Sequence, residues 1–156
     1  MSIETVTEYL TQRGAGDKIR RFDVSSATVA LAAQALGCEE ARIAKTMSFL
    51  VADRAVLIVT AGDTKVNSAK FKARFGTKAK MLTAEQLTEL VGHAPGGVCP
   101  FAVKEGCEVY LDESLKRFDV VYPAAGNAAS AVELTLPELE RFSGSLGWVD
   151  VCAMLV

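Results

Sequence analysis

A lysine interrupts an apolar stretch of the chain. Lys45 lies within residues 43–49, where most of its neighbours are apolar. Burying an ammonium group without a partner is costly, and two interpretations are open. Lys45 either occupies the solvent side of a half-buried strand, or it lines a cleft where it binds an anion or a carbonyl oxygen.

A second feature is the segment 92–101, which contains three glycines and two prolines. This composition predicts a shaped loop. The loop is either an ordinary turn or, because glycine lets backbone N–H groups approach a ligand closely, a cradle for an ester carbonyl and its developing oxyanion. The turn at Gly126 and Asn127 leaves the same two interpretations, since the amide of Asn127 could face a cleft.

The sequence lacks the signatures of several familiar sites. It has no Gly-x-Ser-x-Gly elbow, no phosphate-binding Gly-x-x-x-x-Gly-Lys-Ser/Thr loop and no Gly-x-Gly-x-x-Gly fingerprint. His93 is the single histidine, and the four cysteines do not have the paired spacing of zinc ligands. We therefore expect no metal and no cofactor, and interpret His93 as a structural or solvent-facing residue, with a role as a base as the alternative.

Positive charge is concentrated in one part of the chain. The net charge is −2, but residues 1–80 carry 13 Lys and Arg against 8 Asp and Glu, whereas residues 81–156 carry 4 against 11. The segment 65–80 has no acidic residue, so it is either a solvated helix face or a surface that contacts phosphates. Its basic residues are Lys65, Lys70, Lys72, Arg74, Lys78 and Lys80.

The apolar pattern predicts short helices and strands in mixed order. Helical spacing predicts helices over residues 3–13, 28–36, 66–75, 83–91 and 137–141. Apolar runs predict a hairpin from residues 47–51 and 55–59, with further strands at 109–111, 120–122, 131–134 and around 148–151. This mixture indicates the α+β, or irregular α/β, class, with a mixed sheet flanked by helices. One domain over residues 1–156 is expected.

The sequence predicts a cytoplasmic protein without a membrane partner. The chain opens with no basic region leading into an apolar run, and its apolar stretches are too short to span a bilayer. In a reducing compartment the four cysteines would remain thiols and act mainly as small core residues.

Four segments resemble one protein family in their order and spacing. They are residues 43–46 (Ile-Ala-Lys-Thr), 62–66 (Gly-Asp-Thr-Lys-Val), 95–101 (Pro-Gly-Gly-Val-Cys-Pro-Phe) and 111–115 (Leu-Asp-Glu-Ser-Leu). Together they resemble the YbaK/EbsC family, the superfamily of prolyl-tRNA synthetase editing domains. The ordered combination is more specific than any one segment. No synthetase catalytic or anticodon domain accompanies them, which suggests a free-standing, trans-acting member.

The resemblance implies a fold, an activity and a site. The fold would be a barrel-like mixed sheet flanked by helices. The activity would be hydrolysis of the ester that joins a wrongly chosen small amino acid to the terminal adenosine of tRNA, most often tRNA for proline. Lys45 matches the lysine needed for deacylation, and Thr46 and Asn127 would line the same pocket. The Gly-x-x-x-Pro loop that holds the aminoacyl group would be Gly96, Gly97, Val98, Cys99 and Pro100.

The partners expected from this activity are the acceptor end of aminoacyl-tRNA and an aminoacyl-tRNA synthetase. Lys70, Lys72 and Arg74 would contact tRNA phosphates. An aminoacyl ester is already activated, so its hydrolysis needs positioning and charge stabilisation more than a strong nucleophile. The missing catalytic triad is therefore no objection.

Two competing functions stay open. One is a non-catalytic module of the same fold that binds aminoacyl-tRNA or a synthetase. The other is a thiol-dependent enzyme that uses Cys99, although no activating Cys-x-x-Cys pair is present. Asn67 stands where the resemblance leads us to expect an acidic residue, and this difference and the small Cys99 could both alter which amino acid is accepted.

Overall fold

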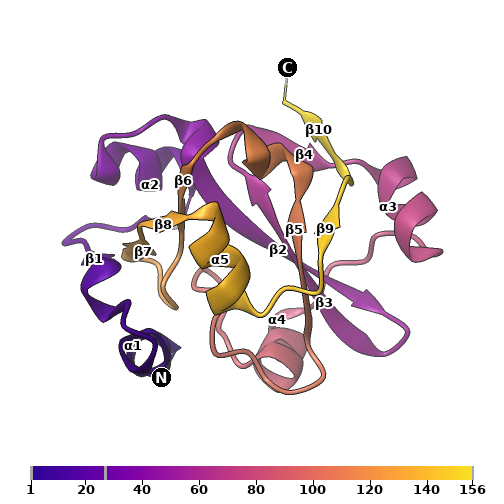
Figure 1. The fold of residues 1–156 in the computed structure, drawn as a ribbon. Coiled ribbons are helices and arrows are strands. Elements are labelled where there is room, and N and C mark those ends of the chain that lie inside the picture. Colours follow the sequence, from indigo (N-terminus) through magenta and orange to yellow (C-terminus); the bar gives the residue numbers. More distant parts are fainter. Residues whose placement is uncertain (1, 27, 156) are drawn as a thin grey trace.

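The centre of the fold is a six-stranded mixed sheet, described by a computed structural model that covers residues 2–26 and 28–155. The strand order is β8-β6-β2-β3-β5-β9, and the sheet curls into a half-barrel (Figure 1). β2 and β3 are antiparallel, whereas β2–β6, β3–β5 and β5–β9 are parallel pairs. The strands of this sheet are β2 (Ile43–Val51), β3 (Arg54–Ala61), β5 (Glu108–Asp112), β6 (Val120–Pro123), β8 (Leu134–Thr135) and β9 (Trp148–Val149).

Two antiparallel ribbons of short strands lie beside this sheet. One pairs β1 with β7, and the other pairs β4 with β10. The second ribbon ties the C-terminal segment to the chain that follows β3. The strands are β1 (Ile19–Arg21), β4 (Thr64–Val66), β7 (Ser130–Val132) and β10 (Cys152–Met154).

The β2–β3 hairpin follows directly from its sequence. Val51 pairs with Arg54, so Ala52 and Asp53 form a two-residue turn, with φ angles of 49° and 66°. Such turns have the twist that two antiparallel strands require. Beyond Arg54, every residue of β3 is buried, which explains why this strand is continuously apolar with little alternation.

The helices begin and end where the sequence supplies caps. The side chains of Thr28, Asn67, Thr83 and Thr135 accept N–H groups at the starts of α2, α3, α4 and α5. Asn67 therefore has a structural role as a helix cap. The helices are α1 (Ser2–Gln12), α2 (Val29–Leu36), α3 (Ser68–Phe75), α4 (Ala84–Gln86) and α5 (Leu136–Ser143), with shorter turns η1 (Gly16–Lys18), η2 (Glu40–Arg42), η3 (Leu87–Val91) and η4 (Glu113–Arg117).

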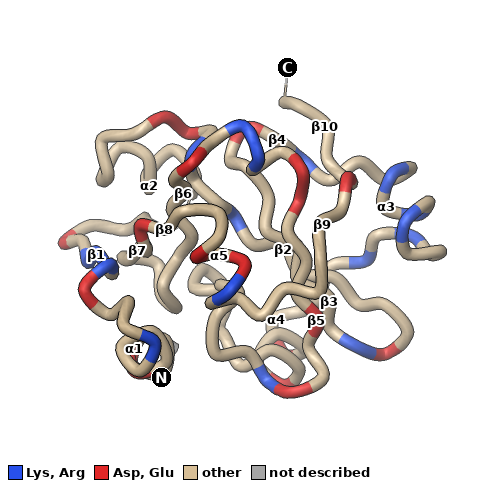
Figure 2. Tube along the Cα trace, viewed as in Figure 1, with Lys and Arg blue, Asp and Glu red and all other residues tan. Residues whose placement is uncertain are grey.

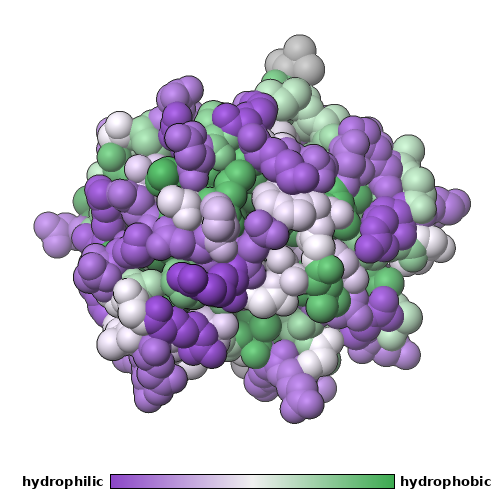
Figure 3. Space-filling model, viewed as in Figure 1, coloured by the Kyte–Doolittle hydropathy of each residue, from purple (hydrophilic) through white to green (hydrophobic). Residues whose placement is uncertain are grey.

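The sheet separates two parts of the core. Leu10, Leu87 and Leu139, from α1, η3 and α5, are buried in the larger cluster. In the smaller cluster, on the other side of the sheet, α3 packs through Phe71 against Phe49 of β2. Their ring centroids lie 4.7 Å apart. Figure 3 shows that the outer face seen there is a mosaic of polar and apolar residues.

The predicted α+β class and the barrel-like mixed sheet flanked by helices are confirmed. All five expected helices and the hairpin are present, whereas the short strands β1, β4 and β10 were not anticipated. Within the described residues, no helix is long and apolar enough to cross a membrane.

The capping box of α5 supports a stability prediction. Thr135 Oγ1 accepts from Glu138 N at 3.3 Å, and Glu138 Oε1 accepts from Thr135 N at 2.9 Å. Thr135→Ala removes the capping oxygen, so the free energy of unfolding should fall by about 1 kcal/mol in urea titrations. Thr135→Ser keeps the oxygen and is the matched control. Equal stability of the Ala and Ser variants would contradict the assignment.

Candidate active site

A cavity of about 380 Å³ lies along one edge of β2. Its walls combine residues from α2, β2, the glycine-proline loop, β6 and β7, which are far apart in the sequence. Successive side chains of a strand point to opposite faces of a sheet, yet all residues from 43 to 48 line this cavity. The cavity therefore wraps over the edge of β2.

The pairing of β2 explains why this edge is open. On the side away from β3, β6 pairs only with Ile43 and Ala44. Pairing resumes at Ser48, whose carbonyl accepts from Leu82 N at 3.2 Å, and at Leu50, whose N–H donates to Lys80 O at 2.8 Å. Backbone groups alternate in direction along a strand. The N–H and C=O of Thr46 therefore point to the same open edge.

Lys45 lines the cavity and is half-buried. Its ammonium donates to the carbonyl oxygen of Thr64, the first residue of β4. Burial lowers the pKa of Lys45, and the nearby groups of Cys152 and Asp63 oppose that shift. A lysine ammonium has three donors, so the bond to Thr64 leaves donors for a ligand.

Thr46 brings an unsatisfied hydroxyl to the same cavity. Its Oγ1 is buried and has no hydrogen-bond partner within the described protein, although Thr46 lines the cavity wall. Ser48 and Ser130 also line it and are 6% and 3% exposed. A buried polar group without a partner is costly, so the Thr46 hydroxyl is suited to bond with water or a ligand.

The glycine-proline loop forms another wall through Gly96 and Val98. Gly97 lies behind this wall, in close contact with the turn at Gly126 and Asn127. A Cβ added at Gly97 would lie 2.5 Å from the carbonyl oxygen of Gly126 and 2.8 Å from Cα of Asn127. Only glycine permits this approach. Asn127 does not line the cavity, and its Oδ1 accepts from Ala129 N at 3.0 Å.

Cys99 and Pro100 are buried beneath the loop and do not line the cavity. The sulfur of Cys99 lies 3.6 Å from Nε2 of His93, and that nitrogen is 2.9 Å from the carbonyl oxygen of Phe101. Complete burial raises the pKa of the Cys99 thiol to about 12, and burial lowers the pKa of His93. These side chains therefore support the loop from behind, which disfavours a thiolate or histidine mechanism.

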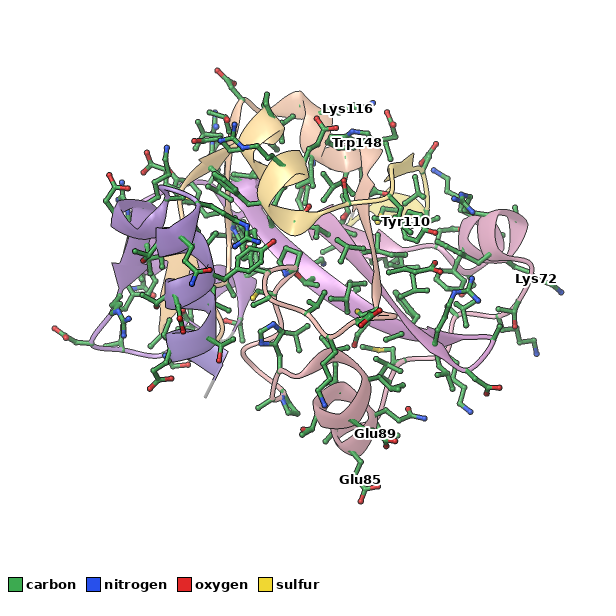
Figure 4. The ribbon with its side chains drawn as sticks, turned by 60° about the horizontal axis from the view of Figure 1, so that its bottom comes forward. Lys72, Glu85, Glu89, Tyr110, Lys116 and Trp148 are labelled. Carbon is green, nitrogen blue, oxygen red and sulfur yellow. The ribbon has the colours of Figure 1, made fainter. Side chains whose placement is uncertain are left out.

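The three basic residues predicted to contact phosphates lie on α3, and none of them lines the cavity. Lys70 is engaged with Asp150 Oδ1 at 3.1 Å and with the carbonyl of Cys152. The guanidinium of Arg74 lies over the Phe75 and Tyr110 rings, whereas Lys72 points into solvent (Figure 4). The charge-coloured trace shows this basic segment at one end of the molecule (Figure 2).

Several cavity residues carried no signal in the sequence. Ser26 lies just before α2 and Val29 at its start, Tyr122 lies on β6 and Ser130 on β7, and only the folded chain brings these three segments together. No group of acidic, histidine and cysteine side chains in the described residues could hold a metal ion.

Comparisons with known proteins identify the family. Residues 24–142 match the family described as aminoacyl-tRNA editing domain. The chain belongs to this family. A relative in Bacillus subtilis (strain 168), the uncharacterized protein YwhH, is 47% identical over 153 residues, which are 97% of this chain and 98% of YwhH.

Two further relatives link the chain to prolyl-tRNA synthetases. The proline–tRNA ligase of Bacillus pumilus (strain SAFR-032) is 32% identical over 85 residues, which are 54% of this chain but 15% of the ligase. A crystal structure of a candidate trans-editing enzyme for prolyl tRNA synthetase is 30% identical, covers 97% of both chains and superposes with a TM-score of 0.87. The editing-domain fold therefore extends over nearly the whole chain.

The contact between the two loops generates a prediction at Gly97. A methyl group in Gly97→Ala would clash with the backbone of Gly126 and Asn127, so the free energy of unfolding should fall by about 1–3 kcal/mol. Amide NMR signals of Gly126 and Asn127 should move. In Gly106→Ala no atom lies near the added carbon, and the positive φ of 91° strains only the local backbone, so those two signals should stay in place. Unchanged stability of Gly97→Ala would refute the close contact.

Proposed function

We propose that the protein is a trans-acting aminoacyl-tRNA deacylase that hydrolyses the ester of a mischarged small amino acid, most often on tRNA for proline. The observation that carries this proposal is the cavity on the open edge of β2, whose walls include Lys45, Gly96 of the loop and Thr46 with its unpartnered hydroxyl. Membership of the editing-domain family supports it. The proposed site is Lys45 with Thr46, Gly96 and Val98 as cavity-lining residues, supported from behind by Gly97, Cys99, Pro100 and Asn127.

The chemistry requires stabilisation of an oxyanion. A water oxygen forms a bond to the ester carbonyl carbon, either directly or with a hydroxyl of the substrate taking up its proton, and the bond from that carbon to the ribose oxygen then breaks. Water supplies the proton that the ribose oxygen takes up, so the products are the free amino acid and tRNA. Among the described residues that line the cavity, Lys45 is the one charged side chain. Its ammonium stabilises the negative charge that develops on the carbonyl oxygen or binds the terminal phosphate.

The cavity dimensions suit a small aminoacyl group. Its volume of about 380 Å³ lies at the low end of the range for small-molecule sites. Ala32, Ala44 and Ala131 contribute short side chains to the walls. Short wall side chains leave space for the aminoacyl group, and the volume of the cavity sets the upper limit on its size.

Replacement of Lys45 tests the activity. Lys45→Met keeps an aliphatic stem but removes the ammonium, so hydrolysis should fall about 100-fold or more. The assay incubates the protein with tRNA for proline charged separately with alanine, cysteine, serine or proline, and follows loss of the ester. Lys104→Met, at an exposed position outside the basic segment 65–80 and outside the cavity, is the matched control.

Two outcomes would refute this assignment. Full activity of Lys45→Met would remove Lys45 from the mechanism. Binding of charged tRNA without any hydrolysis by the unmodified protein would select the non-catalytic module instead.

The proposed tRNA contact is tested by salt dependence. Replacing Lys72 with alanine should weaken tRNA binding and reduce the slope of log K against log[salt] by about 1. Lys70→Ala and Arg74→Ala should have smaller effects on the slope, because these side chains are engaged by Asp150 and by aromatic rings. The control is Lys104→Ala, near α4. An unchanged slope in the Lys72 variant would contradict the contact.

A further inference from the structure

The segment after β5 lies outside the cavity, and the proposed function gives it no role. It is η4, which directly follows Asp112 at the end of β5, and none of these residues lines the cavity. Asp112 is 1% exposed, and its carboxylate accepts from Ser114 N and from Val151 N, each at 2.9 Å. The start of η4 is thereby fixed to the C-terminal part of the chain.

η4 in turn holds the tight turn between β3 and β4. Ser114 Oγ accepts from Ala61 N at 3.2 Å, where β3 ends. Arg117 forms a bidentate pair with the Asp63 carboxylate: Nη1 donates to Oδ2 at 2.9 Å and Nη2 donates to Oδ1 at 2.6 Å. A two-armed arginine–carboxylate pair fixes the orientation of both groups.

Thr64, the residue that follows this turn, receives the ammonium of Lys45. Thr64 is 1% exposed, its hydroxyl donates to Ala61 O at 2.8 Å, and its carbonyl accepts from Lys45. A chain of direct contacts therefore runs from η4 through the turn to the lysine at the cavity. This chain does not depend on any ligand.

Asp63 is placed between two cations. Hydrogen bonds from Arg117 lower the pKa of the Asp63 carboxyl, and the charge of Lys45 lowers it further. The Cys152 thiol also faces Lys45, but burial raises its pKa to about 12, so it is neutral near pH 7. With both carboxylate oxygens of Asp63 bound to Arg117, Lys45 makes its hydrogen bond to the neutral carbonyl of Thr64 instead of an ion pair.

We propose that Arg117 is a positioning residue that holds the Asp63 carboxylate and so prevents it from pairing with Lys45. An ion pair between Asp63 and Lys45 would draw the ammonium away from the cavity and neutralise its field. The proposal rests on the proposed function only in taking Lys45 as the catalytic lysine. Its structural part, the competition for Asp63, is independent of any substrate.

The test removes Arg117 and then Asp63. In Arg117→Gln the freed carboxylate should pair with Lys45, so NMR titration of the Lys45 side chain should show a higher pKa. Ester hydrolysis should fall about 10- to 100-fold. Adding Asp63→Asn should return the Lys45 pKa to or below its original value and restore hydrolysis to within about threefold. A purely structural role for Arg117 would not produce this rescue.

The two readouts separate this proposal from the proposed function. If the unmodified protein hydrolyses no aminoacyl ester, the proposed function fails, and the Lys45 titration still decides whether Arg117 controls the pairing of Asp63. An unchanged Lys45 pKa in Arg117→Gln, or a double variant no more active than Arg117→Gln, overturns the positioning role.

Thermal unfolding verifies that each variant is folded. If Arg117→Gln does not fold, Asp63→Asn alone carries the test. It should lower the Lys45 pKa and retain hydrolysis to within about threefold. Loss of hydrolysis as severe as in Lys45→Met would then overturn the proposal, because Asp63 itself would be required.

Discussion

The site depends on the incomplete hydrogen bonding of one strand. β2 is paired with β3 from Ala44 to Val51, but on its other side it has partners only near its two ends. Buried backbone groups without partners are costly, and a central strand would ordinarily be paired on both sides. The unpaired N–H and C=O groups of this open stretch therefore need hydrogen bonds from water or a ligand.

The most distinctive polar groups lie on this open stretch or beside it. Thr46 presents its backbone and its hydroxyl there, while Lys45 extends from the other face of the strand to the turn at Thr64. The apolar residues around Lys45 form β2, and their buried side chains hold this strand in the core. The cost of burying the lysine is reduced because the side chain is only half-buried and its ammonium donates to a carbonyl.

Local sequence signals predicted most of the fold. Gly37 ends α2, Gly76 ends α3, and two apolar runs predicted the β2–β3 hairpin, although its turn falls at Ala52 and Asp53 and Thr28 is the residue that caps α2. Each of these features acts over a few residues. By contrast, β4 and β10 have three residues each and pair across 88 positions of sequence at Lys65 and Ala153, so no local pattern predicts them.

The site was predictable only in part, for a related reason. The loop composition located Gly96 beside the cavity, but alternation does not apply in a loop, so the sequence could not indicate that Cys99 turns inward toward His93. The serine and tyrosine side chains that complete the walls, Ser26, Ser130 and Tyr122, come from separate elements. Their convergence is a property of the sheet topology.

The electrostatics of the cavity bear on how it would select its substrate. Because Lys45 is the one charged group on the described walls, the field favours a developing oxyanion but offers no carboxylate to the ammonium of an amino acid. Discrimination must then come from shape, and one methylene in an apolar pocket is worth about 1–3 kcal/mol. The volume of about 380 Å³ limits the size of the bound group, yet apolar walls separate small side chains only weakly. A deacylase with this cavity would accept several small amino acids, so the identity of the tRNA would have to be recognised outside it.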